Sequence, residues 1–228
     1  MTYLRIVEAV KTIVLAFTAL FPLVNPVGGA PIFLSLTRRY PQSVQRVLAR
    51  KIAIYGFALL AGSLILGTEV LSFFGISLTV VQIAGGLVVA ITGWNLLNQN
   101  PDVAAASEPG TLEDALQHAF FPLTLPITVG PGCISVAITL GAHLRYQNDA
   151  EHGLYFRFFG SALIGMALVC LLVVVCYGNA DRLVRILGPS GTSILTRLSA
   201  FILLALGVQI IWNGLESGLP QIFVKGTH

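Results

Sequence analysis

Two short motifs rich in proline and glycine carry the groups of this sequence that can bind a ligand. The first is Asn25-Pro-Val-Gly-Gly-Ala-Pro31, and the second comprises Pro122-Leu-Thr-Leu-Pro126 and Gly130-Pro-Gly132. Each proline removes a backbone N–H and clashes with the preceding helical turn, so a continuous helix is not expected through either motif. A broken helix leaves N–H and C=O groups without partners, and these groups can bind a carboxylate and an ammonium respectively.

The candidate binding residues are the residues that break the backbone and their polar neighbours. The amide of Asn25 can both donate and accept hydrogen bonds, and the second motif adds two threonine hydroxyls. The glycines leave free space at the wall of a pocket because they carry no side chain. The predicted substrate-binding residues are Asn25, Pro26, Gly28, Gly29, Pro31, Thr124, Pro126, Thr128, Gly130, Pro131 and Gly132.

The chemistry of such a site follows from the charges it lacks. The interiors of the apolar stretches contain no Asp, Glu, Lys or Arg, so a ligand with net charge would find no counter-ion. A zwitterion differs, since a half-helix N-terminus can take its carboxylate while unwound carbonyls take its ammonium. A small neutral amino acid is therefore the favoured ligand. The sequence has no nucleophile-base pair and no Cys/His cluster, so we expect no enzyme, cofactor or metal site.

The elements that must position these motifs are membrane-spanning helices. Hydrophobic residues make up 55% of the 228 residues and charged residues 10%, against roughly 25% charged in soluble domains. Each uncharged stretch is about as long as the ~17–25 residues of a transmembrane helix, or longer. The six stretches are residues 12–37, 52–68, 70–101, 115–142, 158–180 and 198–215. We predict an all-α integral membrane protein with six transmembrane helices. The sequence has no basic tract that would bind nucleic acid, so we expect no nucleic-acid partner.

The two motifs also divide the chain into related halves. Three prolines and a Phe-Pro-Leu sequence recur 100 residues later without a gap, as Phe21-Pro22-Leu23, Pro26 and Pro31 and then Phe121-Pro122-Leu123, Pro126 and Pro131. We predict one transmembrane domain over residues 1–228, with repeat 1 at 1–100, a cytoplasmic linker at 101–114 and repeat 2 at 115–228. Because a three-helix unit ends on the side opposite its start, the repeats must be inverted, each with its first helix broken.

Basic residues predict the orientation. The loop after the first stretch contains no acidic residue and five basic ones, Arg38, Arg39, Arg46, Arg50 and Lys51. The positive-inside rule makes this loop cytoplasmic, which places the N- and C-termini outside.

Inverted repeats whose broken helices meet at the membrane midplane are typical of secondary transporters. The sequence therefore predicts a transporter that works by alternating access. Two ordinary proline kinks, relieved by neighbouring helices, are the structural alternative. The functional alternative is a channel-like or regulatory membrane module without a transport cycle.

Several segments along the chain carry a family resemblance. They are Asn25-Pro-Val-Gly-Gly-Ala-Pro-Ile-Phe33, Phe74-Gly-Ile-Ser77, Ile83-Ala-Gly-Gly-Leu87, Pro122-Leu-Thr-Leu-Pro126, Gly130-Pro-Gly132 and Gly207-Val-Gln209. Together they resemble the MarC family of six-helix neutral amino-acid transporters, which is similar in architecture to lysine-exporter-type carriers. The resemblance implies an exporter or exchanger of small neutral amino acids in the bacterial or archaeal cytoplasmic (inner) membrane. Cys133 and Ser199-Ala200-Phe201 depart from the residues usual in that family.

Energy coupling is open at this point, because no carboxylate or histidine lies at mid-depth to relay a proton. Sodium held by unwound carbonyls, protonation at Glu69 or Glu216, and simple exchange all agree with the residues. The expected partners are the lipid bilayer and a small neutral amino acid, with Na⁺ or H⁺ as coupling ion. A homo-oligomer is also compatible with the sequence.

Overall fold

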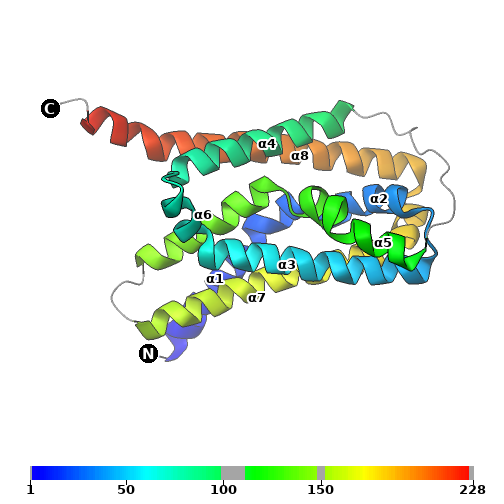
Figure 1. Ribbon diagram of the computed structural model, residues 1–228, viewed down its shortest axis with the longest axis horizontal. Coiled ribbons are helices and arrows are strands. Elements are labelled where there is room, and N and C mark those ends of the chain that lie inside the picture. Colours follow the sequence, from blue (N-terminus) through cyan, green and yellow to red (C-terminus); the bar gives the residue numbers. More distant parts are fainter. Residues whose placement is uncertain (1, 99–110, 148–151, 226–228) are drawn as a thin grey trace.

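The computed structural model describes residues 2–98, 111–147 and 152–225, and in these ranges all regular elements are helical (Figure 1). They are α1 (Thr2–Val24), α2 (Pro26–Thr37), α3 (Gln42–Phe73), α4 (Leu78–Asn98), α5 (Leu112–His118), η1 (Ala119–Thr128), α6 (Pro131–Gln147), α7 (His152–Gly178) and α8 (Ala180–Lys225). Most of the predicted linker, residues 101–110, lies outside the described residues.

The described helices include five spans long and apolar enough to cross a membrane. A bent pair, Leu112–Thr128 with Pro131–Leu144, makes a sixth crossing if its two pieces are one span. Exposed faces carry large apolar side chains, such as Trp94 at 59% exposure and Phe201 at 59%, and lipid solvates such faces. The predicted all-helical membrane protein is therefore confirmed, with five or six spans.

The chain runs back and forth along the long axis of the molecule, and both ends of the chain lie at the same end of that axis (Figure 1). The elements of the second half run opposite to their counterparts in the first half: α5 and α6 against α1 and α2, α7 against α3, and α8 against α4 (Figure 1). Inverted repeats require these directions, but the two-fold relation itself stays a prediction. The side of the membrane on which the termini lie also stays a prediction.

Packing joins the two halves to each other. The main helix contacts among the described residues are α4 with α8, α3 with α7, α1 with α7, α3 with α6, α4 with α6, and α2 with α8. Each of these pairs takes one helix from each half. At the offset of 100 residues, α1 corresponds to α5 and η1, and α2 corresponds to α6. The α1–α7 contact therefore corresponds to the contact of η1 with α3, and the α2–α8 contact to the α4–α6 contact. All the described helices therefore share one core.

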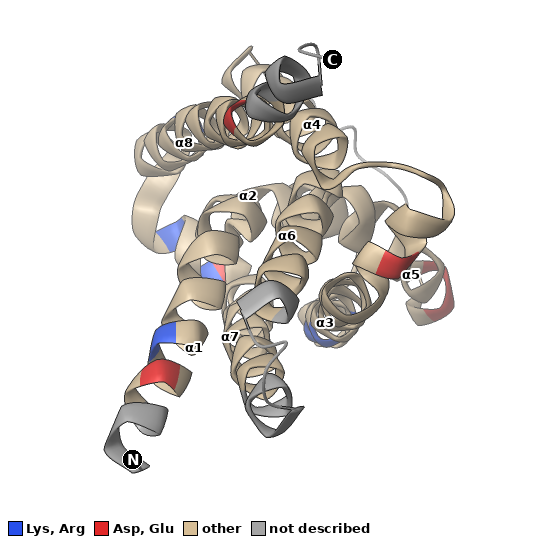
Figure 2. Cartoon of the chain, turned by 90° about the vertical axis from the view of Figure 1, so that its left-hand side faces the viewer, with Lys and Arg blue, Asp and Glu red and all other residues tan. Residues whose placement is uncertain are grey.

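The helices form two walls with the broken helices between them. Viewed end-on, α4 and α8 lie together on one side, α1, α3 and α7 lie on the other, and α2 and α6 lie in the middle (Figure 2). Glycines let α4 and α8 pack closely: a Cβ on Gly86 would lie 2.7 Å from the carbonyl oxygen of Gly207. A Cβ on Gly93 would lie 2.8 Å from the carbonyl oxygen of Ala200. Small residues at such crossings are usual between membrane helices.

Candidate functional site

The first break is a single residue, Asn25, between α1 and α2. Asn25 has φ 46° and ψ 59°, the left-handed conformation that asparagine adopts more readily than most residues. Its side-chain Oδ1 accepts a hydrogen bond from the Gly28 N–H at 3.1 Å. Its own N–H donates to Phe21 and its carbonyl accepts from the Gly29 N–H, both at 2.8 Å. These bonds restart the helix at once, so Gly28, Gly29 and Pro31 lie inside α2, where the sequence predicted broken backbone.

The second break is longer. Phe121 and Leu125 have extended φ and ψ angles inside η1. Val129, with φ −119° and ψ 91°, and Gly130 separate η1 from α6. The hydroxyls of Thr124 and Thr128 each donate to a carbonyl five residues earlier, that of Ala119 and that of Leu123, both at 2.7 Å. The Phe121–Pro122 and Leu125–Pro126 peptide bonds are cis. At this break the span is bent by 70°.

The two breaks occupy the same register of the repeat. Asn25 precedes Pro26 and Leu125 precedes Pro126, and both residues leave the helical conformation. Only the second break bends its span by more than 40°. The position of each break thus follows the sequence prediction, whereas the extent of the break differs between the halves.

A cavity of about 90 Å³ lies where the two breaks meet. One water molecule needs only about 10–15 Å³ of such space, so the cavity can hold a small solute. Seven predicted site residues line it: Asn25, Gly29, Pro126, Thr128, Gly130, Pro131 and Gly132. The rest of the wall includes Val88, Val89, Thr92 and Leu96 of α4 and Leu203 of α8. No Asp, Glu, Lys, Arg or His is among its lining residues in the described part of the chain.

Four predicted site residues, Pro26, Gly28, Pro31 and Thr124, do not line this cavity. Gly28 lies under the side chain of Asn25, because a Cβ on Gly28 would lie 2.5 Å from the Asn25 Nδ2 and against the Ser199 hydroxyl. Thr124 is fully buried, and its hydroxyl donates to the backbone of η1. Gly28 and Thr124 therefore hold the shape of the breaks. Ser199, which departs from the usual family residue, brings a hydroxyl from α8 to the first break.

Tyr177 of α7 contacts both breaks, although it is not among the site residues predicted from the sequence. Its side chain is 2% exposed, and its hydroxyl lies 3.2 Å from the Thr128 Oγ1. Its ring stacks on Phe33 with 4.7 Å between ring centroids, and a Cβ on Gly29 would lie 2.5 Å from its hydroxyl. A tyrosine inside the apolar stretch 158–180 was the available signal, because a buried hydroxyl needs a partner. The α4 residues that line the cavity could not be predicted, because their sequence is that of an ordinary apolar transmembrane helix.

The polar groups at the cavity have defined roles. The Gly28 N–H donates to the Asn25 Oδ1, so the amide nitrogen Nδ2 is the group left to donate to a ligand. Pro131, four residues after Ile127, has no N–H that could donate to the Ile127 carbonyl. The N-terminus of α6 begins at Pro131, on the cavity wall, and carries the partial positive charge of the helix. The site thus combines donors and acceptors without a net charge.

Comparison with known proteins identifies the family of this chain. Residues 10–219 match the family described as MarC family integral membrane protein. The chain belongs to the MarC family. The resemblance predicted from the motifs is confirmed, and the protein is an integral, multi-pass membrane protein.

Relatives in the MarC family come from archaea and bacteria. The UPF0056 membrane protein of Methanocaldococcus jannaschii is 30% identical over 207 residues, which cover 90% of this chain and 97% of that protein. YvbG, a UPF0056 membrane protein of Bacillus subtilis, is 30% identical over 213 residues, which cover 92% of this chain and 97% of YvbG. The UPF0056 inner membrane protein MarC of Salmonella typhimurium is 30% identical over 210 residues, which cover 90% of this chain and 94% of that protein. No solved structure matches the chain.

Proposed function

We propose that this protein is a secondary transporter, an exporter or exchanger, of small neutral amino acids in the cytoplasmic (inner) membrane. The observation that carries the proposal is the cavity of about 90 Å³, which both breaks line together and which has uncharged polar groups. A ligand bound there without a counter-ion must be neutral overall. A zwitterion of the size of glycine, alanine or serine is neutral overall and small enough for the cavity.

The polar groups suggest how such a zwitterion binds. The Asn25 Nδ2 and the N-terminus of α6 favour the carboxylate, because Nδ2 is a donor and the start of α6 carries a partial positive charge. The Ile127 carbonyl, to which Pro131 offers no N–H, favours the ammonium. The glycines at positions 29, 130 and 132 keep the backbone within reach of a small solute. Larger side chains are disfavoured by the wall formed by Val88, Val89 and Leu203.

Alternating access requires one group of helices to move against another around the fixed site. The α4–α8 pair forms one wall of the cavity, and the layer of α1, α3 and α7 lies on the other side of the broken helices (Figure 2). We infer that these two walls rock against each other. The close packing of Gly86 against Gly207 favours movement of α4 and α8 as one body.

Counterflow in proteoliposomes tests the proposal. Purified protein in liposomes loaded with unlabelled alanine should accumulate labelled alanine, glycine or serine, and should not accumulate labelled lysine or glutamate. Imposing sodium and pH gradients separately identifies the coupling ion. Absence of counterflow for all small neutral amino acids would refute the transport function. A flux that does not saturate with solute would instead favour a channel.

Two substitutions of Asn25 distinguish the role of its side chain from the role of its backbone conformation. Asn25→Gly keeps the left-handed conformation but removes the amide, so the apparent KM should rise about 10–100-fold, as expected for a lost hydrogen bond to a charged group. Asn25→Ala should have the same effect and also destabilise the protein by roughly 1–2 kcal/mol, because alanine is strained in that conformation. An unchanged KM in a folded Asn25→Gly protein would remove the amide from the site.

A further inference from the structure

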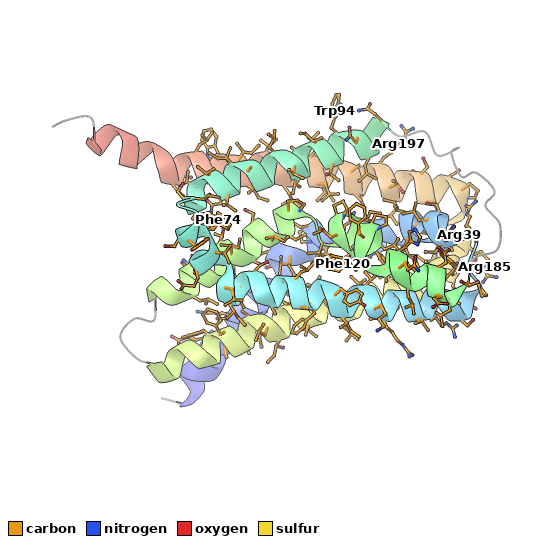
Figure 3. All side chains as sticks on the ribbon, viewed as in Figure 1. Arg39, Phe74, Trp94, Phe120, Arg185 and Arg197 are labelled. Atoms are coloured by element: carbon orange, nitrogen blue, oxygen red, sulfur yellow. The ribbon has the colours of Figure 1, made fainter. Side chains whose placement is uncertain are left out.

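A second cavity lies at the end of the molecule where α2 meets α3 and α7 meets α8. It has a volume of about 450 Å³ and is lined by Leu34, Arg38, Gln42, Gln45, Asp181 and Val184. We call it the loop-end cavity. Figure 3 labels Arg39 and Arg185, which lie near it in the sequence, at this end of the molecule. None of its lining residues belongs to the site between the two breaks.

The loop-end cavity carries one positive and one negative side chain, unlike the uncharged cavity at mid-depth. Arg38 comes from the end of the first broken span, and Asp181 from the first turn of α8. Asp181 forms an ion pair with Arg185 through its Oδ2. A carboxylate has about four lone-pair positions, so this pair leaves Asp181 capacity for another donor. A guanidinium and a carboxylate on one cavity wall match the two charges of an amino acid zwitterion.

Gln45 makes the wall of the loop-end cavity rigid. Its side chain is 8% exposed, and its Nε2 donates to the Thr37 carbonyl at 3.0 Å and to the Tyr40 carbonyl at 3.3 Å. These bonds tie the start of α3 to the end of α2, on which Arg38 follows directly. The cation is therefore attached to a fixed turn of backbone.

The two cavities share helix α2. Ile32 lines the cavity between the breaks, and Leu34, two residues later, lines the loop-end cavity. Phe33 between them is 1% exposed and stacks on Tyr177. A rise of about 1.5 Å per residue makes this separation short along the helix axis. The polar groups of the two sites lie at opposite ends of α2, because Asn25 precedes the helix and Arg38 follows it, which places them about 20 Å apart along the axis.

From this placement, we propose that the loop-end cavity is a second binding site for the transported zwitterion, where Arg38 takes the carboxylate and Asp181 takes the ammonium before the solute reaches the site between the breaks. The proposal rests on the proposed function for its solute. The headgroup of phosphatidylethanolamine carries the same two charges, so the test must distinguish this lipid from a free amino acid.

Equilibrium binding of labelled alanine to the purified protein in detergent tests the proposal. The unmodified protein should bind two alanines per chain, and Arg38→Gln should bind one, as should Asp181→Asn. Asn25→Gly should lose the other site. Two matched controls should keep both sites: Arg46→Gln removes a charge from the exposed start of α3, and Arg185→Gln breaks the ion pair while keeping the Asp181 carboxylate.

The outcomes separate this proposal from the proposed function. Equal stoichiometry in the unmodified protein and Arg38→Gln would overturn the second site, even if counterflow occurs. Two-site binding without counterflow would support the second site and refute transport. Binding to neither site would overturn both. Displacement of alanine from the Arg38-dependent site by added phosphatidylethanolamine, but not by phosphatidylcholine, would assign that site to the lipid and overturn the proposal.

Discussion

At the level of single residues, Tyr177 explains why position 29 is a glycine. The tyrosine hydroxyl occupies the place where a side chain on α2 would begin, and it also contacts Thr128 of the second break. One buried side chain of α7 thus fixes the distance between the two breaks. The distance matters because both breaks line the same cavity.

A double-mutant cycle tests this contact. Gly29→Ala should destabilise the protein by roughly 1–3 kcal/mol, because its methyl would meet the Tyr177 hydroxyl at 2.5 Å. Tyr177→Phe alone should cost about 0.5–1.5 kcal/mol for the lost hydrogen bond to Thr128. In the double variant the oxygen is gone, and only ring carbons at 3.3 Å remain near the methyl.

The double variant should therefore be more stable than the sum of the single effects by about 1 kcal/mol or more. Unfolding of the purified proteins by titration with sodium dodecyl sulfate measures the three free energies. Additive effects would show that Tyr177 does not restrict position 29.

At the level of helices and breaks, the sequence predicts where the breaks lie but not their shape. A proline identifies the missing N–H, so Pro26 and Pro126 locate both interruptions. How far a span bends depends on which partners the freed groups find. Asn25 caps its own helix through Gly28, whereas the second break relies on threonine hydroxyls that bond five residues back. These partners lie only three to five residues away, but the backbone conformation that brings them together depends on packing against other helices, as does the Tyr177 contact.

The α4–α8 contact offers a test on the same scale. Gly86→Ala should destabilise the protein by roughly 1–3 kcal/mol, because a Cβ there would lie 2.7 Å from the backbone oxygen of Gly207, which cannot rotate away. Gly62→Ala in α3 is the matched control, since a Cβ at that position has nothing within 4 Å. The control should be neutral or stabilising by up to about 1 kcal/mol. Titration with sodium dodecyl sulfate again measures both, and equal effects would contradict the close approach of the two helices.

For the whole molecule, the contacts between halves lead to a prediction about assembly. If the chain is cut between residues 104 and 105, the two fragments expressed together should form a complex, because the main contacts join helices of different halves. Each fragment alone should accumulate to a several-fold lower level, since unpacked chains are degraded. Purification through a tag on one fragment, with the other detected in the same fraction, measures the assembly. A fragment that is stable and monomeric alone would contradict the prediction.

The same contacts have a consequence during synthesis. A ribosome adds about 5–20 residues per second, so residues 101–228 take roughly 6–25 s to follow the first half. During this interval α1 to α4 lie in the membrane without the helices against which they pack. The polar backbone at Asn25 then faces lipid or the insertion machinery. We expect newly made chains to be most exposed to proteases and to wrong pairing in those seconds.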